Sequence, residues 1–321
     1  MKATYIAAQG GTDQFVYGEI PEPAIAPDEI LVRVRACGVN RLDVFGREGS
    51  HGVRMQSPQH VLGLDLAGEV EDVGSYVAHT KRFKKGDRVL GVGSGGTYAE
   101  YARAPMDRVH LMPDWMSFEE AAAIPTVYAA AWRAIVVRAR ITFGEDALVM
   151  AAGSGVGTAA IQIAKYAGCR VLTTASSDAK LEKARALGAD IGINYKEHPE
   201  FSKQVLEHTG GAGVDLIYEH IGQSVFDQCY RSLKRGTGRL VTNGVTSGHL
   251  TQLHLGQLWT REVSLIGSTM HPELDLPAIM KGVARKALRG VVDRVFPLKD
   301  AAEAHRVLES NDFFGKLVLV P

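Results

Sequence analysis

The chain has 321 residues, 45% hydrophobic and 22% charged, which is an ordinary globular balance in a chain long enough for two domains. Lys and Arg together number 36, as do Asp and Glu, so the formal net charge of zero gives no global attraction to nucleic acid or to an anionic membrane. The scattered cysteines Cys37, Cys169 and Cys229 supply neither a disulfide framework nor a structural zinc knuckle.

The N-terminus and the apolar segments predict where the protein resides. The first residues, MKATYIAAQGG, contain no long apolar core followed by a small-residue cleavage site, so they do not indicate a secretory signal. No apolar run reaches the length that spans a bilayer. We therefore expect a cytoplasmic protein that binds neither membranes nor nucleic acid.

Short strand signals dominate roughly the first hundred residues. Residues 29–39, EILVRVRACGV, alternate between two faces, and shorter β-prone runs bounded by Gly or Asp follow at 66–74 and 86–93. Regularly spaced short strands with few long helical patterns are typical of a β-rich, barrel-like domain. The last residues, 315–321 (GKLVLVP), predict a further strand that returns to this domain.

From Ser117 onward the pattern changes to alternating helices and strands. Ser117 and Glu120 have the spacing of a capping box, and the Ala-rich helical sequence after them leads to an apolar strand at 147–151. Helical patterns at 157–168 and 179–189 then alternate with apolar strands. The later predicted strands are 170–175, 191–195, 214–222, 238–245 and 263–270. This order predicts an α/β fold with a doubly wound parallel sheet covered on both faces.

A glycine-rich turn, AGSGVG at 152–157, joins the first of these strands to its helix. A helix N-terminus offers unpaired N–H donors and a partial positive charge, and small residues let phosphate oxygens approach the backbone. Between a strand and a helix such a turn is typical of dinucleotide binding, whereas the alternative is a tight turn without a ligand. We predict a diphosphate site at Ser154, Gly155, Val156 and Gly157.

The end of the next strand indicates which dinucleotide binds. Sites that prefer NAD usually place Asp or Glu there to bind the ribose 2′-hydroxyl. This chain has Ser176 and Ser177 at that point and Lys180 shortly after, and hydroxyl donors with a lysine attract a 2′-phosphate. Asp178 is interpreted as the N-cap of the following helix. The predicted cofactor is therefore NADP(H).

Further motifs occur in order along the chain: ACGVNRLDVFGREG (36–49), LGLDLAGEVEDVG (62–74), GTYAEYA (96–102), EEAAAIPTVYAAAW (119–132), GADIGINY (188–195) and FGKLVLV (314–320). With them the chain resembles the medium-chain dehydrogenase/reductase superfamily, specifically its zinc-free quinone-oxidoreductase-like branch. The resemblance covers nearly the whole chain. It implies a GroES-like catalytic domain, residues 1–122 and 270–321, a Rossmann nucleotide-binding domain, residues 123–269, and a homodimer or homotetramer.

The resemblance also bears on metal binding. Where zinc-dependent alcohol dehydrogenases of the superfamily carry a Cys ligand and a Gly-His-Glu motif, this chain has Asn40 and Gly63-Leu64-Asp65. Cys37 lies three residues before Asn40 and does not match the ligand position. A leucine cannot bind zinc, and the lobe with four cysteines that carries the structural zinc is absent. No metal is therefore predicted.

The resemblance places further residues at the cofactor. It implies that Asn40 lies beside the nicotinamide, that Asp43 in the same motif holds the loop by hydrogen bonds, and that Tyr195 binds the 2′-phosphate. Tyr128 is a candidate proton source. The other implied cofactor contacts are Asn243, Gly244, Val245, Ser268, Phe314, Gly315 and Lys316.

Without zinc, hydride transfer to a simple ketone lacks a Lewis acid that polarises the carbonyl, whereas conjugated acceptors need less help. We therefore expect hydride transfer from NADPH to a small-molecule quinone or an activated enone. The alternatives are a zinc-independent alcohol or enoyl-thioester reductase, and a largely non-catalytic NADPH-binding protein. The sequence leaves open the physiological acceptor, the proton donor, the oligomeric state and the use of NADH.

Overall fold

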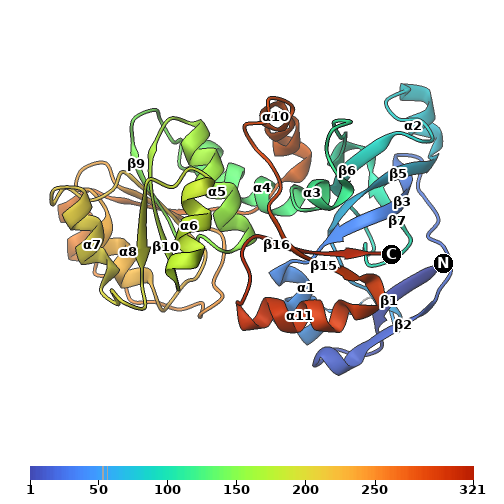
Figure 1. Ribbon diagram of the computed structural model, residues 1–321, viewed down its shortest axis with the longest axis horizontal. Coiled ribbons are helices and arrows are strands. Elements are labelled where there is room, and N and C mark those ends of the chain that lie inside the picture. Colours follow the sequence, from blue (N-terminus) through green and yellow to red (C-terminus); the bar gives the residue numbers. More distant parts are fainter. Residues whose placement is uncertain (53, 56) are drawn as a thin grey trace. The chain divides into compact units, whose positions relative to one another are not determined.

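The computed structural model describes residues 1–52, 54–55 and 57–321 and divides them into two compact units. Unit 1 comprises Met1–Thr126 and Pro272–Pro321 and therefore holds both termini (Figure 1), and unit 2 comprises Val127–His271. The sequence analysis placed these boundaries after residues 122 and 269. Thr126 N–H donates to Asp65 Oδ1 at 2.7 Å, which ties the chain beyond residue 122 to unit 1.

Two sheets, a larger mixed one and a smaller antiparallel one, form the framework of unit 1. The larger has the order β15-β16-β3-β5-β6-β8, with β7 paired to β3. Its strands are β3 (Glu29–Gly38), β5 (Asp65–Val73), β6 (Arg88–Val92), β7 (Tyr101–Pro105), β8 (Val109–Leu111), β15 (Val292–Pro297) and β16 (Lys316–Val320). The smaller sheet, in the order β2-β1-β4, consists of β1 (Lys2–Ile6), β2 (Phe15–Glu19) and β4 (His60–Val61).

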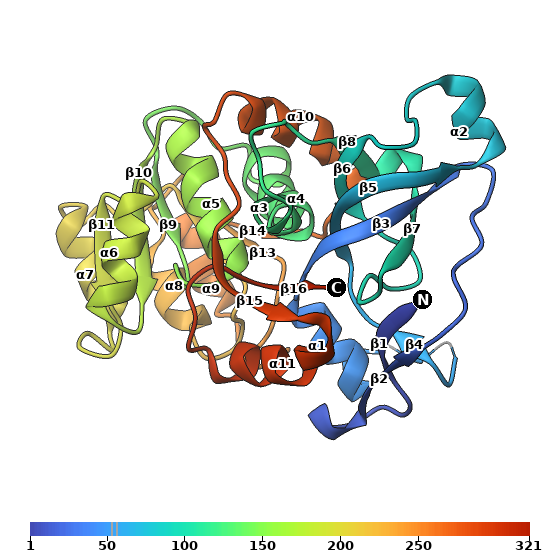
Figure 2. The ribbon, with the colours of Figure 1, turned by 45° about the vertical axis from the view of Figure 1, so that its right-hand side comes forward.

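The returning C-terminal strand is confirmed, because β16 pairs antiparallel with β3 through Val318–Gly38 and Leu319–Cys37. Figure 2 shows β3 and β5 side by side, and their register includes Val34 opposite Gly68. The order β16-β3-β5 therefore brings three chain segments that are far apart in the sequence into one part of the sheet.

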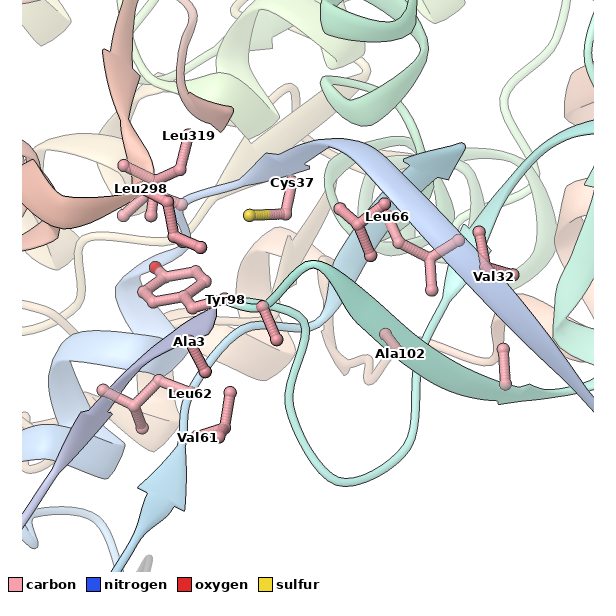
Figure 3. Packing of buried hydrophobic residues seen from close by; sticks show 14 of the residues in the cluster. Ala3, Val32, Cys37, Val61, Leu62, Leu66, Tyr98, Ala102, Leu298 and Leu319 are labelled. Carbon is pink, nitrogen blue, oxygen red and sulfur yellow. The ribbon is translucent and has the colours of Figure 1, made fainter. Parts of the chain in front are cut away.

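The core of unit 1 lies between these strands and the segments that cover them. Figure 3 shows the Cys37 side chain among Tyr98, Leu298 and Leu319, and all four are at most 2% exposed. Burial raises the pKa of the Cys37 thiol far above its usual range. Cys37 is therefore a small core residue, and its thiol stays protonated and unreactive at neutral pH.

Short helices complete unit 1: α1 (Arg41–Glu48), α2 (Ser75–Thr80), α3 (Phe118–Ala122), α10 (Pro272–Ala284), α11 (Ala301–Ser310) and 3₁₀ turns at Thr12–Gln14, Met106–Arg108 and Leu298–Asp300. Helix α3 begins at the predicted cap, where Ser117 Oγ accepts from Glu120 N–H. Helix α11 buries Ala304, His305 and Leu308, a spacing of three and four residues that gives one inward face.

Unit 2 contains the predicted parallel sheet, with six strands in the order β11-β10-β9-β12-β13-β14. They are β9 (Asp146–Val149), β10 (Arg170–Ala175), β11 (Ile191–Asn194), β12 (Leu216–Glu219), β13 (Arg239–Thr242) and β14 (Ser264–Gly267). All of their pairings are parallel. The strand order reverses at β9, and ligands of such sheets bind at the carboxyl ends of the strands beside this reversal.

Helices cover both faces of this sheet, as predicted. Figure 1 shows α5 and α6 on one side of β9 and β10, and α7 and α8 on the other. The helices are α4 (Pro125–Trp132), which continues as a π-helix (Arg133–Arg138), α5 (Gly155–Tyr166), α6 (Asp178–Ala186), α7 (Phe201–His208), α8 (Phe226–Ser232) and α9 (Leu255–Arg261). None of the helices in the described part of the chain combines the length with the apolar character that a membrane crossing requires.

Candidate functional site

The glycine-rich turn lies where β9 ends and α5 begins. Ser154 is the N-cap of α5, and its Oγ accepts from Gly157 N–H at 2.9 Å and donates to Ala151 O at 2.9 Å. A Cβ on Gly157 would lie 2.2 Å from Ala151 O, so the close packing of helix and strand requires glycine there. The Ser154 hydroxyl, which the sequence analysis placed at the diphosphate, is thus engaged within the turn.

The turn can receive an anion through its backbone. The N–H groups of Gly155 and Val156 precede the first intrahelical hydrogen bond of α5 and therefore have no partner within the helix. The positive end of the helix dipole adds a favourable field for phosphate. His220 was missed by the sequence analysis: it follows β12, and its Nε2 lies 3.3 Å from Ser154 Oγ and 3.3 Å from Met150 O.

The carboxyl ends of β10 and β11 bring together the residues predicted for the 2′-phosphate. Ala175 is paired with Asn194 at this edge, so Ser176 and Ser177 follow one strand and Tyr195 follows its neighbour. Tyr195 N–H donates to Ala175 O at 3.1 Å, and its side chain is 41% exposed. Lys180, in the first turn of α6, begins close to the same edge.

The prediction that Asp178 caps α6 is wrong. Ser177 is the N-cap: it has extended backbone angles, and its Oγ accepts from Lys180 N–H, whereas Asp178 is already the first helical residue. The Asp178 carboxylate instead accepts from Asn194 Nδ2 at 3.2 Å. The role of Asp178 therefore differs from the predicted one, but the Ser176 and Ser177 hydroxyls and Lys180 still lie at the carboxyl ends of β10 and β11.

Residues at and just beyond the carboxyl ends of β12 and β13 form a second, polar part of the same edge. The buried Glu219 carboxylate accepts from the N–H groups of Ile221 and Gly222, and burial raises its pKa. Tyr218 OH donates to Asn243 Oδ1 at 3.1 Å. Asn243 is thereby oriented at the start of the segment that continues through Gly244 and Val245.

Ser268, one of the implied cofactor contacts, follows β14. Its N–H donates to Thr242 O at 2.9 Å, and its buried Oγ has no hydrogen-bond partner among the residues that the structure describes. An open hollow of about 390 Å³ lies beside it, lined by Arg133, Arg138, Gly267, Ser268, Thr269 and His271. A buried hydroxyl without a partner is a group that a ligand could satisfy.

In unit 1, three side chains form a buried cluster that we call the ammonium cluster: Asn40, Asp65 and Lys316. The Lys316 ammonium donates to Asn40 Oδ1 at 2.6 Å, to Asp65 Oδ2 at 2.9 Å and to Val39 O at 2.8 Å. Asn40 Nδ2 donates to Asp65 Oδ2 at 3.0 Å. Lys316 was expected to contact the cofactor, but all three of its N–H bonds are directed to acceptors of unit 1.

The sheet order explains why these residues meet. Asn40 follows β3, Asp65 begins β5 and Lys316 begins β16, and these strands are neighbours. Lys316 and Asp65 are 251 positions apart in the sequence, so spacing alone gave no sign of the pair. Close by, Thr126 was also missed: its N–H binds Asp65 Oδ1, and its buried Oγ1 has no partner among the described residues.

Asp43 holds the loop that carries Asn40. Its Oδ2 accepts from Asn40 N–H at 2.7 Å and from Tyr98 OH at 3.1 Å, which is the structural role that the resemblance implied. Burial raises the pKa of the Asp43 carboxyl to about 7. Because Tyr98 donates its proton to Asp43, its oxygen accepts from His305 Nε2, 3.2 Å away.

His305 continues this network toward the surface. Its Nδ1 lies 3.4 Å from Arg47 Nη1, an obligatory donor, so the imidazole is the neutral Nε2–H tautomer. Burial and the Arg47 charge lower the pKa of His305 to about 3. Arg47 is itself paired with Glu309, at 2.8 Å. No pattern in the sequence pointed to His305, Arg47 or Glu309.

The remaining predicted residues lie in different settings. Tyr128, in α4, is 1% exposed. Phe314 is buried, and its N–H donates to Asp293 Oδ1 at 3.1 Å. Gly315 has a φ of +111°, and a Cβ there would lie 2.5 Å from Val291 O, so this position requires glycine. Gly315 thus sets the chain direction from which Lys316 enters the ammonium cluster.

Comparison with known proteins agrees with this architecture. Two family models match, Alcohol dehydrogenase GroES-like domain over residues 26–114 and Zinc-binding dehydrogenase over residues 155–285. The chain is 32% identical to the quinone oxidoreductase of Sus scrofa, across 100% of this chain and 98% of that protein. Among solved structures, an NAD-dependent alcohol dehydrogenase matches with a TM-score of 0.94 and 38% sequence identity. The Escherichia coli quinone oxidoreductase complexed with NADPH matches with a TM-score of 0.88 and 29% identity. Each match covers 100% of both chains. The chain therefore belongs to the medium-chain dehydrogenase/reductase superfamily, in its quinone oxidoreductase-like branch.

Proposed function

We propose that the protein is an NADP(H)-dependent oxidoreductase that reduces a quinone or an activated enone by hydride transfer without catalytic zinc. The observation that carries this proposal is the edge of unit 2, where the turn at the start of α5 and the hydroxyl groups after β10 lie at adjacent strand ends. The similarity to quinone oxidoreductases supports the substrate class. A bound reduced nicotinamide supplies the hydride.

The residues present fit the nucleotide. The amides of Gly155 and Val156 would bind the diphosphate, and Ser176, Lys180 and Tyr195 would bind the 2′-phosphate. The solved relatives include both an NADPH complex and an NAD-dependent enzyme, so the choice rests on this chain's own edge. That edge favours NADP(H), because no carboxylate occupies the positions directly after Ala175.

Zinc does not fit the residues at the corresponding centre. Asn40 offers an amide, Leu64 offers no ligand atom, and Asp65 Oδ2 and Asn40 Oδ1 both accept from the Lys316 ammonium. Zinc in proteins is bound by thiolate, imidazole and carboxylate, and a neighbouring ammonium would repel it. Among the described residues no group of three or more His, Cys, Asp or Glu side chains is arranged to hold a metal ion.

A centre without zinc limits the class of acceptor that can be reduced. Without a Lewis acid, the negative charge that hydride transfer creates must be spread by the acceptor itself, as a quinone or enone does. The protein would contribute positioning and exclusion of water. Asn40 is the side chain proposed, from the family resemblance, to contact the nicotinamide or the acceptor. The Tyr128 hydroxyl remains a proposed proton source, with solvent as the alternative.

We also propose a homodimer. Strand β14 is at the edge of the sheet of unit 2, and an edge strand offers unpaired backbone groups to a second copy. Large apolar side chains are exposed on this strand and shortly before it: Leu265 of β14 is 36% exposed and Trp259 of α9 is 72% exposed. The implied contact is between Rossmann units, as the family resemblance suggests.

A turnover assay tests the proposed reaction. NADPH oxidation by the purified protein would be followed with benzoquinone, naphthoquinone, cyclohexenone and cyclohexanone, each against the rate without protein. We expect catalysed reduction of the quinones or of the enone and none of cyclohexanone. Reduction of cyclohexanone would favour the alcohol-dehydrogenase alternative, and tight NADPH binding without turnover across the panel would favour the non-catalytic binding protein.

A further inference from the structure

The ammonium cluster buries a full positive charge that the chemistry proposed above does not use directly. Lys316 is 3% exposed and Asp65 is 0% exposed. A buried ammonium is costly unless all of its N–H bonds find acceptors and a counter-charge is close. Lys316 meets both conditions, through Val39 O, Asn40 Oδ1 and the Asp65 carboxylate.

We propose that Lys316 is a positioning residue, the buried cation that fixes the orientation of the Asn40 amide. This inference rests on the proposed function, in which Asn40 lies beside the nicotinamide. It assigns to Lys316 no contact with the cofactor, because its donors are used within unit 1.

The charges around Asn40 allow only one orientation of its amide. Oδ1 faces the ammonium at 2.6 Å, and Nδ2 faces the Asp65 carboxylate at 3.0 Å and Gly38 O at 3.3 Å. A rotation by 180° would direct the NH₂ group against the ammonium and the amide oxygen against the carboxylate. Both contacts would then be repulsive, so the pair selects the observed orientation.

The backbone of Asn40 is held by other means. Asn40 N–H donates to Asp43 Oδ2, and Asp43 is in turn held by Tyr98 OH. Loss of the ammonium would remove the partner of Asn40 Oδ1 and leave Nδ2 bonded to Asp65 Oδ2 and Gly38 O. It would therefore loosen the Asn40 side chain without releasing its loop. Because Asp43 holds the backbone of Asn40 and Lys316 holds its side chain, we expect loss of the ammonium to slow hydride transfer with little change in cofactor affinity.

Kinetics with three variants test the role. We expect Lys316→Met to slow single-turnover hydride transfer by about tenfold, as misplacement of a positioning group does. The Kd for NADPH, which rests on unit 2, should stay within about twofold. Asn40→Ala should show a similar loss, and the double variant Lys316→Met/Asn40→Ala should be no slower than Asn40→Ala. The proposal would be overturned if the rate losses of the two single variants multiplied in the double variant, or if Lys316→Met left the hydride-transfer rate unchanged. A raised Kd for NADPH in Lys316→Met would overturn it as well.

Lys165→Met is the matched control. Lys165 also pairs with an aspartate, Asp190, at 2.7 Å, but on the surface of unit 2, where the lysine side chain is 45% exposed. Its removal should leave the rate unchanged. Lys316→Met could fail to fold because Asp65 loses its counter-charge. In that case the double variant Lys316→Met/Asp65→Asn, which removes both charges, takes the place of Lys316→Met in the same comparison.

A readout without turnover separates this inference from the proposed function. The side-chain NH₂ protons of Asn40, assigned by their loss in Asn40→Ala, should be resolved and protected from hydrogen exchange in the wild-type protein. In Lys316→Met, or in Lys316→Met/Asp65→Asn, exchange should accelerate by about tenfold or more. Unprotected protons in the wild type, or exchange that the variants do not change, would refute the role of Lys316 even if quinones are reduced. If no acceptor is reduced but protection depends on Lys316, only the proposed function fails.

Discussion

Single side chains after β10 carry the proposed preference of unit 2 for NADP(H). Ser177 serves as the cap of α6 and Asp178 accepts from Asn194, so the acid is occupied by a neighbouring amide. Lys180 lies in the first turn of the helix, close enough in the chain to reach a phosphate at the strand end. We therefore expect the proposed selectivity for NADP(H) to depend strongly on Lys180.

We predict that Lys180→Met raises the Kd for NADPH by about 10- to 100-fold, the equivalent of one charge-assisted hydrogen bond, and leaves the Kd for NADH nearly unchanged. Fluorescence titration of both nucleotides measures the two constants. Lys183→Met, in the same helix and exposed, is the control and should change neither. Equal losses for NADPH and NADH in Lys180→Met would show that the lysine does not bind the 2′-phosphate.

His305 makes the stability of unit 1 depend on pH. Its pKa is about 3 in the folded protein and about 6.5 in an unfolded chain, so unfolding takes up a proton between these values. The contribution of His305 to the free energy of unfolding is therefore complete above pH 6.5. It falls by about 1.4 kcal/mol for each pH unit below that.

We predict that the difference in the free energy of unfolding between wild type and His305→Gln shrinks by about 1.4 kcal/mol per unit as the pH is lowered from about 6.5 to 4.5. Urea denaturation at several pH values measures it. His79→Gln, at an exposed histidine, is the control and should show a constant difference. A constant difference for His305→Gln as well would mean that His305 titrates normally in the folded protein.

At the level of elements, the junction of β9 and α5 is tightly constrained. A Cβ on Gly157 would overlap Ala151 O, and Ala151 itself has a φ of +52°. The strand and the helix can separate only by opening the turn that presents the Gly155 and Val156 amides. Nucleotide affinity and local packing are therefore coupled at Gly157.

Gly157→Ala should lower the free energy of unfolding by about 1–3 kcal/mol, as overpacking does. It should also weaken the binding of NADPH and of NADH to the same extent, because both nucleotides contain the diphosphate. Calorimetry and nucleotide titration provide the two values. Gly18→Ala, where an added Cβ meets only ordinary contacts with the Tyr5 ring at 3.6 Å, is the control. An unimpaired Gly157→Ala variant would contradict the proposed geometry of the turn.

The sequence predicted the elements of unit 2 better than those of unit 1. Uninterrupted apolar strands and the glycine turn identify β9–α5–β10 without tertiary information. In unit 1, the cap at Ser117 likewise identifies the start of α3. Helix α11 was missed because its buried face combines alanines with His305, which weakens the apolar period. The cap of α6 was assigned one residue late, since Ser177 and Asp178 are both good caps and only the backbone angles decide between them.

The candidate site was predictable only where it is local in the chain. Gly155, Val156 and Gly157 follow from one short segment. The Lys316–Asp65 pair arises from the strand order, and nothing in the sequence near either residue indicates it. The family resemblance supplied Asn40 and Asp43 but not the partners that orient them, because hydrogen-bond partners depend on the packing of several distant segments.

At the level of the whole molecule, the open edge of β14 predicts the oligomeric state. We expect light scattering after gel filtration to give twice the chain mass of 34.6 kDa. Leu265→Lys, which places a charge on the edge strand, should shift the protein toward the monomer. Leu111→Lys, at an exposed leucine of unit 1, should not. A monomeric wild type, or a dimer indifferent to Leu265→Lys, would contradict assembly through this edge.

The central claim is that unit 2 binds a pyridine nucleotide by its diphosphate at the start of α5 and by a 2′-phosphate at the end of β10. Isothermal titration of the purified full-length protein with NADPH and with NADH tests it most directly. We predict one NADPH per chain, bound at least about tenfold more tightly than NADH. If neither nucleotide binds, or if NADH binds as tightly as NADPH, the claim is wrong.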